Sequence, residues 1–213
     1  MNSTIRFCDD IGMFAYDRGI PQSCIHATEF CAVNCYNDKL YKIYPAMRGK
    51  DEKNEKYWAI IDGKIVNRDL ARRKKQTSRV RLMTRGEAFS TFSDIARVES
   101  ILSENPETIF WIPTRSWRHP ILRFAVRKLA DKYPNARILA STDPATTSEE
   151  WAQLKADNWS TMFFGDDTQR ITPNGDKHFL CPKTHGGVKA ACAVCKKGCF
   201  RSDKRVDVHL SQH

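Results

Sequence analysis

Eight cysteines, gathered in two groups at opposite ends of the chain, constrain this sequence more than any other feature. The first group is Cys8, Cys24, Cys31 and Cys35, and the second is Cys181, Cys192, Cys195 and Cys199. The N-terminus lacks the apolar stretch of a secretory signal, so we expect a cytoplasmic protein. In a reducing compartment, clustered cysteines are more often metal ligands than disulfides. The grouping predicts two metal or cofactor sites, or one site built from both ends of the chain.

The second group has the spacing of a closed tetrahedral sulfur site. Two residues separate Cys192 from Cys195, which lets both sulfurs turn toward one centre, and Cys181 and Cys199 flank this pair. Four thiolates suit structural zinc or an iron–sulfur cluster, and the spacing does not distinguish the two. A redox Cys-x-x-Cys pair would leave two cysteines unexplained.

Three cysteines of the first group, Cys24, Cys31 and Cys35, lie in one loop that follows a predicted strand. Three ligands can hold a four-iron cluster and leave one iron open, and an open metal position is typical of a reactive site. His26 could instead complete a zinc site. Cys8 precedes the strand, and we expect a packed thiol there.

Between the two cysteine groups, short apolar segments alternate with longer amphipathic ones. The pattern predicts strands at 11–16, 80–83, 108–113, 137–141, 161–164 and 178–180, helices at 37–47, 57–71, 93–104, 120–133 and 148–156, and an exposed charged loop at 48–56. This alternation is typical of an α/β fold with a parallel sheet. An eight-unit barrel takes about 250 residues, so a partial barrel or an open sheet fits this chain better. A turn near residue 173 divides the sequence into an α/β body, residues 1–172, and a cysteine-rich tail, residues 173–213.

Polar residues follow the predicted strands, where parallel α/β folds bind their ligands. They include Arg85, Glu87, Arg115, Ser141 and Asp143. We expect Arg85 and Arg115 to face a cluster on the loop cysteines, where they would stabilise its reduced form or bind an anionic ligand. The basic run 72–75 precedes its strand and should lie at the opposite end of the sheet.

The cysteine triad after the first strand, followed by βα units, resembles the radical S-adenosylmethionine superfamily. More narrowly, the chain resembles the small radical-SAM-like proteins of bacteriophages described as gene product 88. The resemblance rests on the cysteine tail and on four short motifs: CAVNCY at 31–36, RLMTRGE at 81–87, PTRS at 113–116 and NARILAS at 135–141.

This resemblance implies a partial (β/α)6 barrel of parallel strands, with Cys24, Cys31 and Cys35 holding a [4Fe-4S] cluster. It also implies bound S-adenosylmethionine, with Gly86 and Glu87 at the methionine amino group and Ser141 or Asp143 at the ribose. The cysteine tail would hold an auxiliary cluster, with zinc as the alternative. An active enzyme of this kind needs an electron donor, and a phage protein would work in the host cytoplasm.

Two other functions are compatible with the sequence. The formal net charge of +10 favours a polyanionic partner, so a zinc-containing nucleic-acid-binding protein is one alternative. Its basic segments would be the run 72–75, the helix at 120–132 and the tail, and Trp111, Trp117 and Trp151 could stack on bases. The other alternative is an iron–sulfur protein for electron transfer or sensing, without S-adenosylmethionine chemistry. No apolar run approaches the roughly 18 residues of a membrane helix, so we expect no membrane partner.

Overall fold

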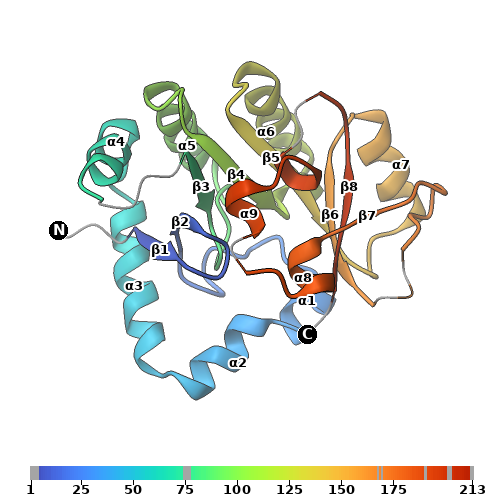
Figure 1. The fold of residues 1–213 in the computed structure, drawn as a ribbon, viewed down its shortest axis with the longest axis horizontal. Coiled ribbons are helices and arrows are strands. Elements are labelled where there is room, and N and C mark those ends of the chain that lie inside the picture. The colour runs from blue at the N-terminus through green and yellow to red at the C-terminus, as the bar shows by residue number, and fades with distance from the viewer. Residues whose placement is uncertain are drawn as a thin grey trace.

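An open, mostly parallel sheet forms the centre of the molecule (Figure 1). The computed structural model describes residues 5–73, 78–166, 168, 170–189, 191–200 and 203–211. Within them the sheet has eight strands in the order β1-β2-β3-β4-β5-β6-β8-β7. Only β1 runs antiparallel to its neighbour; the other pairs are parallel. The strands are β1 (Arg6–Cys8), β2 (Met13–Tyr16), β3 (Arg79–Leu82), β4 (Ile109–Thr114), β5 (Ala136–Thr142), β6 (Thr161–Gly165), β7 (Phe179–Leu180) and β8 (Asp207–Ser211). The predicted α/β class with a parallel sheet is confirmed.

The helices connect the parallel strands, and two of them, α1 and α9, contain a cysteine, Cys31 and Cys192. They are α1 (Glu29–Val33), α2 (Tyr36–Ile43), α3 (Ala46–Trp58), α4 (Gly63–Ala71), α5 (Phe92–Glu104), α6 (Pro120–Lys132), α7 (Ser148–Ala156), α8 (Pro182–Gly186) and α9 (Ala191–Val194). Helices α5, α6 and α7 lie close to their predicted bounds. Thr91 caps α5 through a capping box with Asp94.

The exposed loop predicted at 48–56 is wrong, because this segment lies inside helix α3. Lys, Arg and Glu are good helix formers, so a high charge density does not exclude a helix. Two polar residues of the segment, Asp51 and Asn54, are buried. The helix predicted at 57–71 is divided in two, because the chain leaves α3 after Trp58 and Asp62 caps α4 with its side chain.

Successive residues of each strand point to opposite faces of the sheet, and different segments of the chain cover the two faces. Val80, Leu82, Phe110 and Ile112 point to the face packed by the helices, where Val98, Ile101, Leu102, Leu122 and Val126 complete the main core. The opposite face, which we call the inner face, carries Met13, Trp111, Leu139 and Met162.

The cysteine-rich tail covers the inner face. Cys192 and Phe200 are buried against its side chains, and the Trp111 and Phe200 ring centroids are 5.8 Å apart. In Figure 1 the red helices α8 and α9 lie in front of the sheet. The tail also adds β7 and β8 to the sheet itself, with β8 paired between β6 and β7. The division at residue 173 stays a prediction, although both segments share one sheet.

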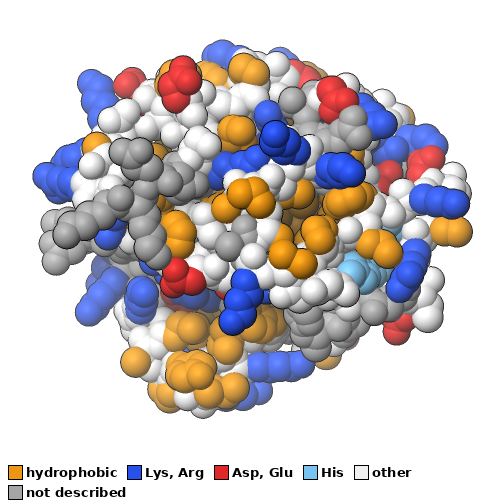
Figure 2. Space-filling model, in the orientation of Figure 1, with side chains coloured by type: hydrophobic (Ala, Val, Ile, Leu, Met, Phe, Trp, Pro, Cys, Tyr) orange, Lys and Arg blue, Asp and Glu red, His pale blue; other side chains and the backbone are white. Residues whose placement is uncertain are grey.

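The surface shows no single basic stripe on the face in view. Figure 2 shows Lys and Arg side chains scattered over this face and an apolar group at its lower edge. Exposed apolar residues of α1 and α2 include Val33, Tyr36 and Ile43. Among the described residues, no helix has the length and apolar character needed to cross a membrane.

We expect Phe200→Ala to release the tail from the inner face. Phe200 is 8% exposed, and removing a buried Phe side chain typically costs about 3–5 kcal/mol. Phe124 is 64% exposed, so Phe124→Ala should change the free energy of unfolding by no more than about 0.5 kcal/mol. Chemical denaturation measures both, and limited proteolysis reports on the tail. Equal losses in the two variants would contradict this packing.

Candidate functional site

The loop that carries Cys24, Cys31 and Cys35 crosses the carboxyl ends of β3, β4 and β5. The three thiols lie close enough to interact electrostatically: Cys24 with both others, and Cys31 with Cys35. Burial, followed by the neighbouring Glu87 carboxylate, raises the pKa of the Cys24 thiol to about 12. The predicted gathering of the triad near polar residues that follow the strands is what the structure has.

Asp143 ties this loop to the sheet. Its carboxylate is completely buried directly after β5. Oδ2 accepts a hydrogen bond of 2.6 Å from the Thr28 hydroxyl and pairs with the Arg115 guanidinium. Thr28 in turn caps α1 by accepting the backbone N–H of Cys31 at 3.0 Å. The position of Cys31 is therefore set by a chain of hydrogen bonds that ends on a buried acid.

Arg115, which follows β4, lies between Asp143 and Cys31. Burial raises the pKa of Cys31, and the positive charge of the nearby Arg115 guanidinium opposes this effect. The predicted placement of Arg115 beside the loop cysteines matches the structure.

Glu87 is a second buried acid of this edge, with an exposed fraction of 5%. Its carboxylate accepts the backbone N–H of Arg115 at 2.7 Å and that of Phe89 at 3.1 Å. Burial raises the pKa of Glu87 in spite of these donors.

Gly86 lets the loop approach Glu87. Its φ is +79°, and a Cβ at this position would lie 2.6 Å from the Ser23 Oγ and 2.8 Å from the Arg18 Cβ. Ser23 precedes Cys24 and accepts the backbone N–H of Glu87 at 3.1 Å. Only glycine fits both the backbone conformation and the space.

Ser141 lies near the end of β5, on the same face of the strand as Leu139, with its backbone carbonyl bonded to the Trp117 indole at 2.8 Å. Trp111, Trp117 and Trp151 are all buried. They belong to the core, so the base stacking considered for the nucleic-acid alternative does not fit the structure.

Arg85 does not point to the cysteines. Its guanidinium binds the Asp51 carboxylate through two hydrogen bonds, of 2.8 and 2.7 Å, and lies 3.2 Å from Asp17. The side chain joins β3 to α3 in a buried ion pair, and its proposed cofactor role stays a prediction. In the basic run 72–75, Arg73 donates to the Ile5 carbonyl, and positions 74 and 75 lie outside the described residues.

The four tail cysteines line a single small cavity of about 30 Å³, together with Trp111, Phe179 and Phe200. Cys192 is on α9, Cys181 caps α8, and Cys195 donates to the Lys197 carbonyl at 3.1 Å. Burial, and next the nearby Cys181, raises the pKa of the Cys192 thiol to about 11. The predicted grouping of the tail cysteines therefore matches the structure.

Two arginines of β3, which are far from any cysteine in the sequence, lie near the tail cysteines. Arg79 donates to the Cys192 carbonyl, and Arg81 interacts electrostatically with Cys192, Cys199 and Cys8. Cys8 thus lies on the tail side rather than with the loop triad. The alternation in β3, with Val80 and Leu82 directed to the other face, is the sequence signal that could have placed Arg81 on the inner face.

Thiolate donors fit zinc or an iron–sulfur cluster at both places. Across residues 5–73 and the later described segments, no group of three or more His, Cys, Asp or Glu side chains could hold a metal ion as it stands. Binding would require the thiols to turn toward a common centre and to lose their protons. His26 packs on His119, with ring centroids 5.3 Å apart.

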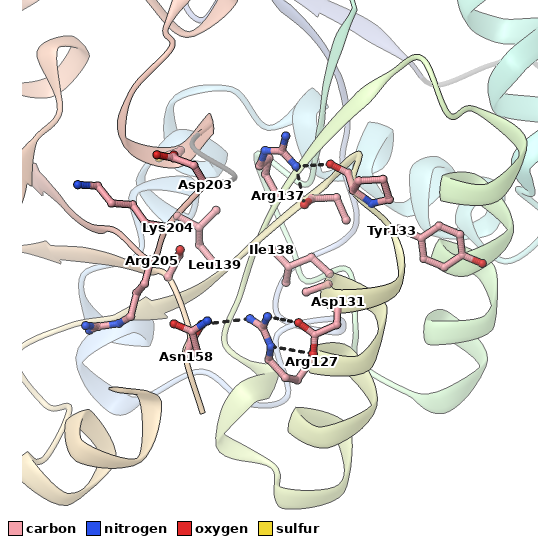
Figure 3. Close-up of a pocket in the computed structure, with 15 residues that line it drawn as sticks. Arg127, Asp131, Tyr133, Arg137, Ile138, Leu139, Asn158, Asp203, Lys204 and Arg205 are labelled. Atoms are coloured by element: carbon pink, nitrogen blue, oxygen red, sulfur yellow. Dashed lines mark hydrogen bonds and ion pairs between the residues drawn. The ribbon is translucent and has the colours of Figure 1, made fainter. Parts of the chain in front are cut away.

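A basic cavity of about 500 Å³ lies at the other edge of the sheet, at the amino ends of β5, β6 and β8 (Figure 3). Its charged lining consists of Arg127, Arg137, Lys204, Arg205, Asp131 and Asp203, and Cys199 also borders it. Asp131 pairs with Arg127, and Asp207 with Arg205. This cavity was not predicted from the sequence, because parallel α/β folds usually bind their ligands at the carboxyl ends of the strands.

We expect Gly86→Ala to destabilise the chain more than Gly175→Ala does. Both glycines have a φ near +80°, but a Cβ at Gly175 meets nothing within 4 Å. The backbone penalty of about 1–2 kcal/mol is therefore shared, and the overpacking against Ser23 and Arg18 adds about 1–3 kcal/mol at Gly86 alone. Chemical denaturation measures the difference, and faster reaction of Cys24 with a thiol reagent would report the displaced loop. Equal losses of unfolding free energy in Gly86→Ala and Gly175→Ala would show that the close approach of residue 86 to Ser23 and Arg18 does not affect stability.

Arg85→Gln should cost about 3–5 kcal/mol, the usual effect of breaking a buried ion pair. Arg127→Gln, which removes an exposed pair with Asp131, should cost about 0.3–0.5 kcal/mol. Burial alone would raise the pKa of Asp17, but Arg6 and Arg85 hold it below its usual value. The stability that this shift contributes is present above the unfolded-state pKa of about 3.9. It is lost as the pH falls through the lower folded-state value.

Urea denaturation of both variants at neutral and acidic pH tests this. The free energy of unfolding of Arg85→Gln should fall less steeply below pH 4 than that of the unmodified chain, whereas Arg127→Gln should follow the unmodified chain. If the free energy of unfolding falls equally steeply below pH 4 in all three proteins, Arg85 does not lower the pKa of Asp17.

Comparison with known proteins identifies the family of this chain. No curated protein and no solved structure matches the chain. A family model described as Gene product 88 matches residues 10–207, which include both cysteine groups except Cys8. The chain belongs to the Gene product 88 family.

Proposed function

We propose that this chain is an iron–sulfur protein of a bacteriophage, with a [4Fe-4S] cluster held by Cys24, Cys31 and Cys35. The observation that carries the proposal is the gathering of these thiols at the carboxyl ends of the strands, beside the buried Glu87. Three ligands leave one position of such a cluster open for a second molecule. Membership of the family supports the phage origin.

The same geometry supports a radical-SAM-like partial barrel that binds S-adenosylmethionine. Cys24, Cys31 and Cys35 would hold the cluster, which would supply one-electron reduction when bound. Glu87 would accept a hydrogen bond from the methionine ammonium group, because its carboxylate is held in place by two backbone donors. Ser141, near the end of β5, and Asp143, directly after it, would orient the ribose. Arg115 would offset negative charge beside Cys31.

In the tail we propose a structural metal site made of Cys181, Cys192, Cys195 and Cys199. The cavity that they line is small, about 30 Å³, and for this reason we propose a single ion, such as zinc, rather than a four-iron cluster. A thiolate-bound metal would supply folding free energy to a segment with only short helices.

Contact with a nucleic acid is the second candidate function, and the basic cavity at the amino edge is the observation that favours it. Phosphates would meet Arg137 and Lys204, which form no ion pair within the described ranges. This function predicts a colourless zinc protein whose affinity for oligonucleotides falls steeply with salt. The iron–sulfur proposal predicts a brown protein, and the two are therefore separated by the colour of anaerobically purified material.

Metal analysis of the purified protein tests the main proposal. We expect iron and sulfide in the unmodified chain and loss of both in Cys24→Ala, Cys31→Ala and Cys35→Ala. Cys8→Ala is the matched control, because Cys8 belongs to the same half of the chain but interacts with Arg81. Unchanged iron in all three triad variants would refute the loop cluster.

The same measurement addresses the tail. Cys192→Ala should remove zinc and leave the iron content unchanged. If Cys192→Ala instead removes iron and sulfide, then the tail holds a second cluster. Addition of S-adenosylmethionine to the reduced protein should change the electron paramagnetic resonance spectrum of the loop cluster; an unchanged spectrum would leave electron transfer or sensing as the function.

A further inference from the structure

Arg81 extends from the inner face of β3 toward the tail cavity. Its neighbours Val80 and Leu82 are completely buried on the opposite face. The guanidinium stacks on the Trp111 ring at 4.4 Å and donates through Nε to the Met83 carbonyl at 3.1 Å. It interacts electrostatically with three cysteines, Cys192, Cys199 and Cys8.

No carboxylate forms an ion pair with Arg81 in the part of the chain that the structure describes. Asp17, the one acid with which it interacts, is already paired with Arg6 and Arg85. Arg81 is half-buried, whereas the buried Arg18 binds Glu55 and Asp94. Because no described acid pairs with Arg81, the side of its guanidinium that meets the thiols lacks a counter-charge.

A second guanidinium, that of Arg79, comes from the same face of β3. Arg79 stacks on the Phe200 ring at 4.2 Å, donates to the Cys192 carbonyl, and interacts electrostatically with Cys195. Lys183 also borders the cavity, but its ammonium group is engaged by Asp10 at 2.6 Å.

We propose that Arg81, assisted by Arg79, is a positioning residue of the tail metal site that compensates the charge of its thiolates. The inference rests on the metal site proposed above. A divalent ion with four thiolates carries a net charge of −2, and two guanidinium groups balance it. The same side chains clamp the tail by stacking on Trp111 and Phe200, so they link metal binding to docking of the tail on the sheet. Residues outside the ligand set typically change metal affinity by about 10- to 100-fold.

Titration of the reduced, metal-free full-length protein with Co²⁺ tests the proposal. Thiolate-to-cobalt charge-transfer absorption reports binding, and the part of it that Cys192→Ala removes belongs to the tail. Arg81→Gln should raise the dissociation constant of that part by about 10- to 100-fold. Arg81→Lys, which keeps the charge, should restore most of the affinity. Arg127→Gln, which removes an arginine stacked on Trp159, should bind as the unmodified chain does.

The outcomes distinguish failure of the proposed tail metal site from failure of the proposed charge compensation. If Cys192→Ala removes no cobalt signal, the tail metal site itself is refuted. If that signal is present but Arg81→Gln binds Co²⁺ unchanged, or Arg81→Lys is as weak as Arg81→Gln, charge compensation is refuted while the site remains. Should Arg81→Gln not fold, Arg79→Gln takes its place and should show a smaller loss in the same direction.

A reduction potential distinguishes charge compensation from a merely structural role. With a single iron ion loaded at the tail in place of cobalt, one electron converts Fe³⁺ to Fe²⁺ and makes the site more negative. Removal of a nearby positive charge disfavours that change. The potential of Arg81→Gln should therefore be lower than that of Arg81→Lys, and equal potentials would overturn the proposal.

Discussion

Two buried carboxylates, Glu87 and Asp143, determine how the carboxyl edge of this sheet is organised. A carboxylate taken out of water must be hydrogen-bonded or paired, and here the donors come from the segments around the cysteine loop. Asp143 is bonded by Thr28, the cap of the helix that carries Cys31, and by Arg115. Helix α1 buries none of its own residues. The thiols are therefore positioned by hydrogen bonds to fixed acids rather than by hydrophobic packing.

The sequence predicted the middle of the fold well because periodicity and topology reinforce each other there. Strands β4 to β6 and helices α5 to α7 have clear apolar patterns, and polar residues after parallel strands necessarily meet at one edge. Glu87, Arg115 and Asp143 could be placed beside the cysteine loop on this ground. Helix α3 was missed, because its buried Asp51 and Asn54 interrupt the apolar face by which helices are recognised. β8 was missed although Val206, Val208 and Leu210 alternate with polar residues, because cysteines dominate the neighbouring sequence.

Sequence position does not determine which arginines pair with an acid. Arg85 and Arg81 belong to the same short motif, and Arg85 was predicted to face the cysteine loop because it follows a strand. Arg85 turns instead toward Asp17 and Asp51, which come from β2 and α3. Arg81 has no such acid and meets the tail thiols, which arrive from about a hundred residues later in the chain. Which arginine is neutralised by an acid depends on long-range packing that no local pattern encodes.

The strand order determines when the tail can dock on the sheet during synthesis. β7 is joined to the sheet only through β8, which comes after it in the chain. During synthesis, which proceeds at about 5–20 residues per second, the tail cysteines emerge from the ribosome before the strand that docks their segment. Until residues 207–211 pair with β6, these thiols are accessible to oxidants and to metal ions in solution. Docking of the tail over its cysteines therefore waits until the strand at residues 207–211 has been made and can pair with β6.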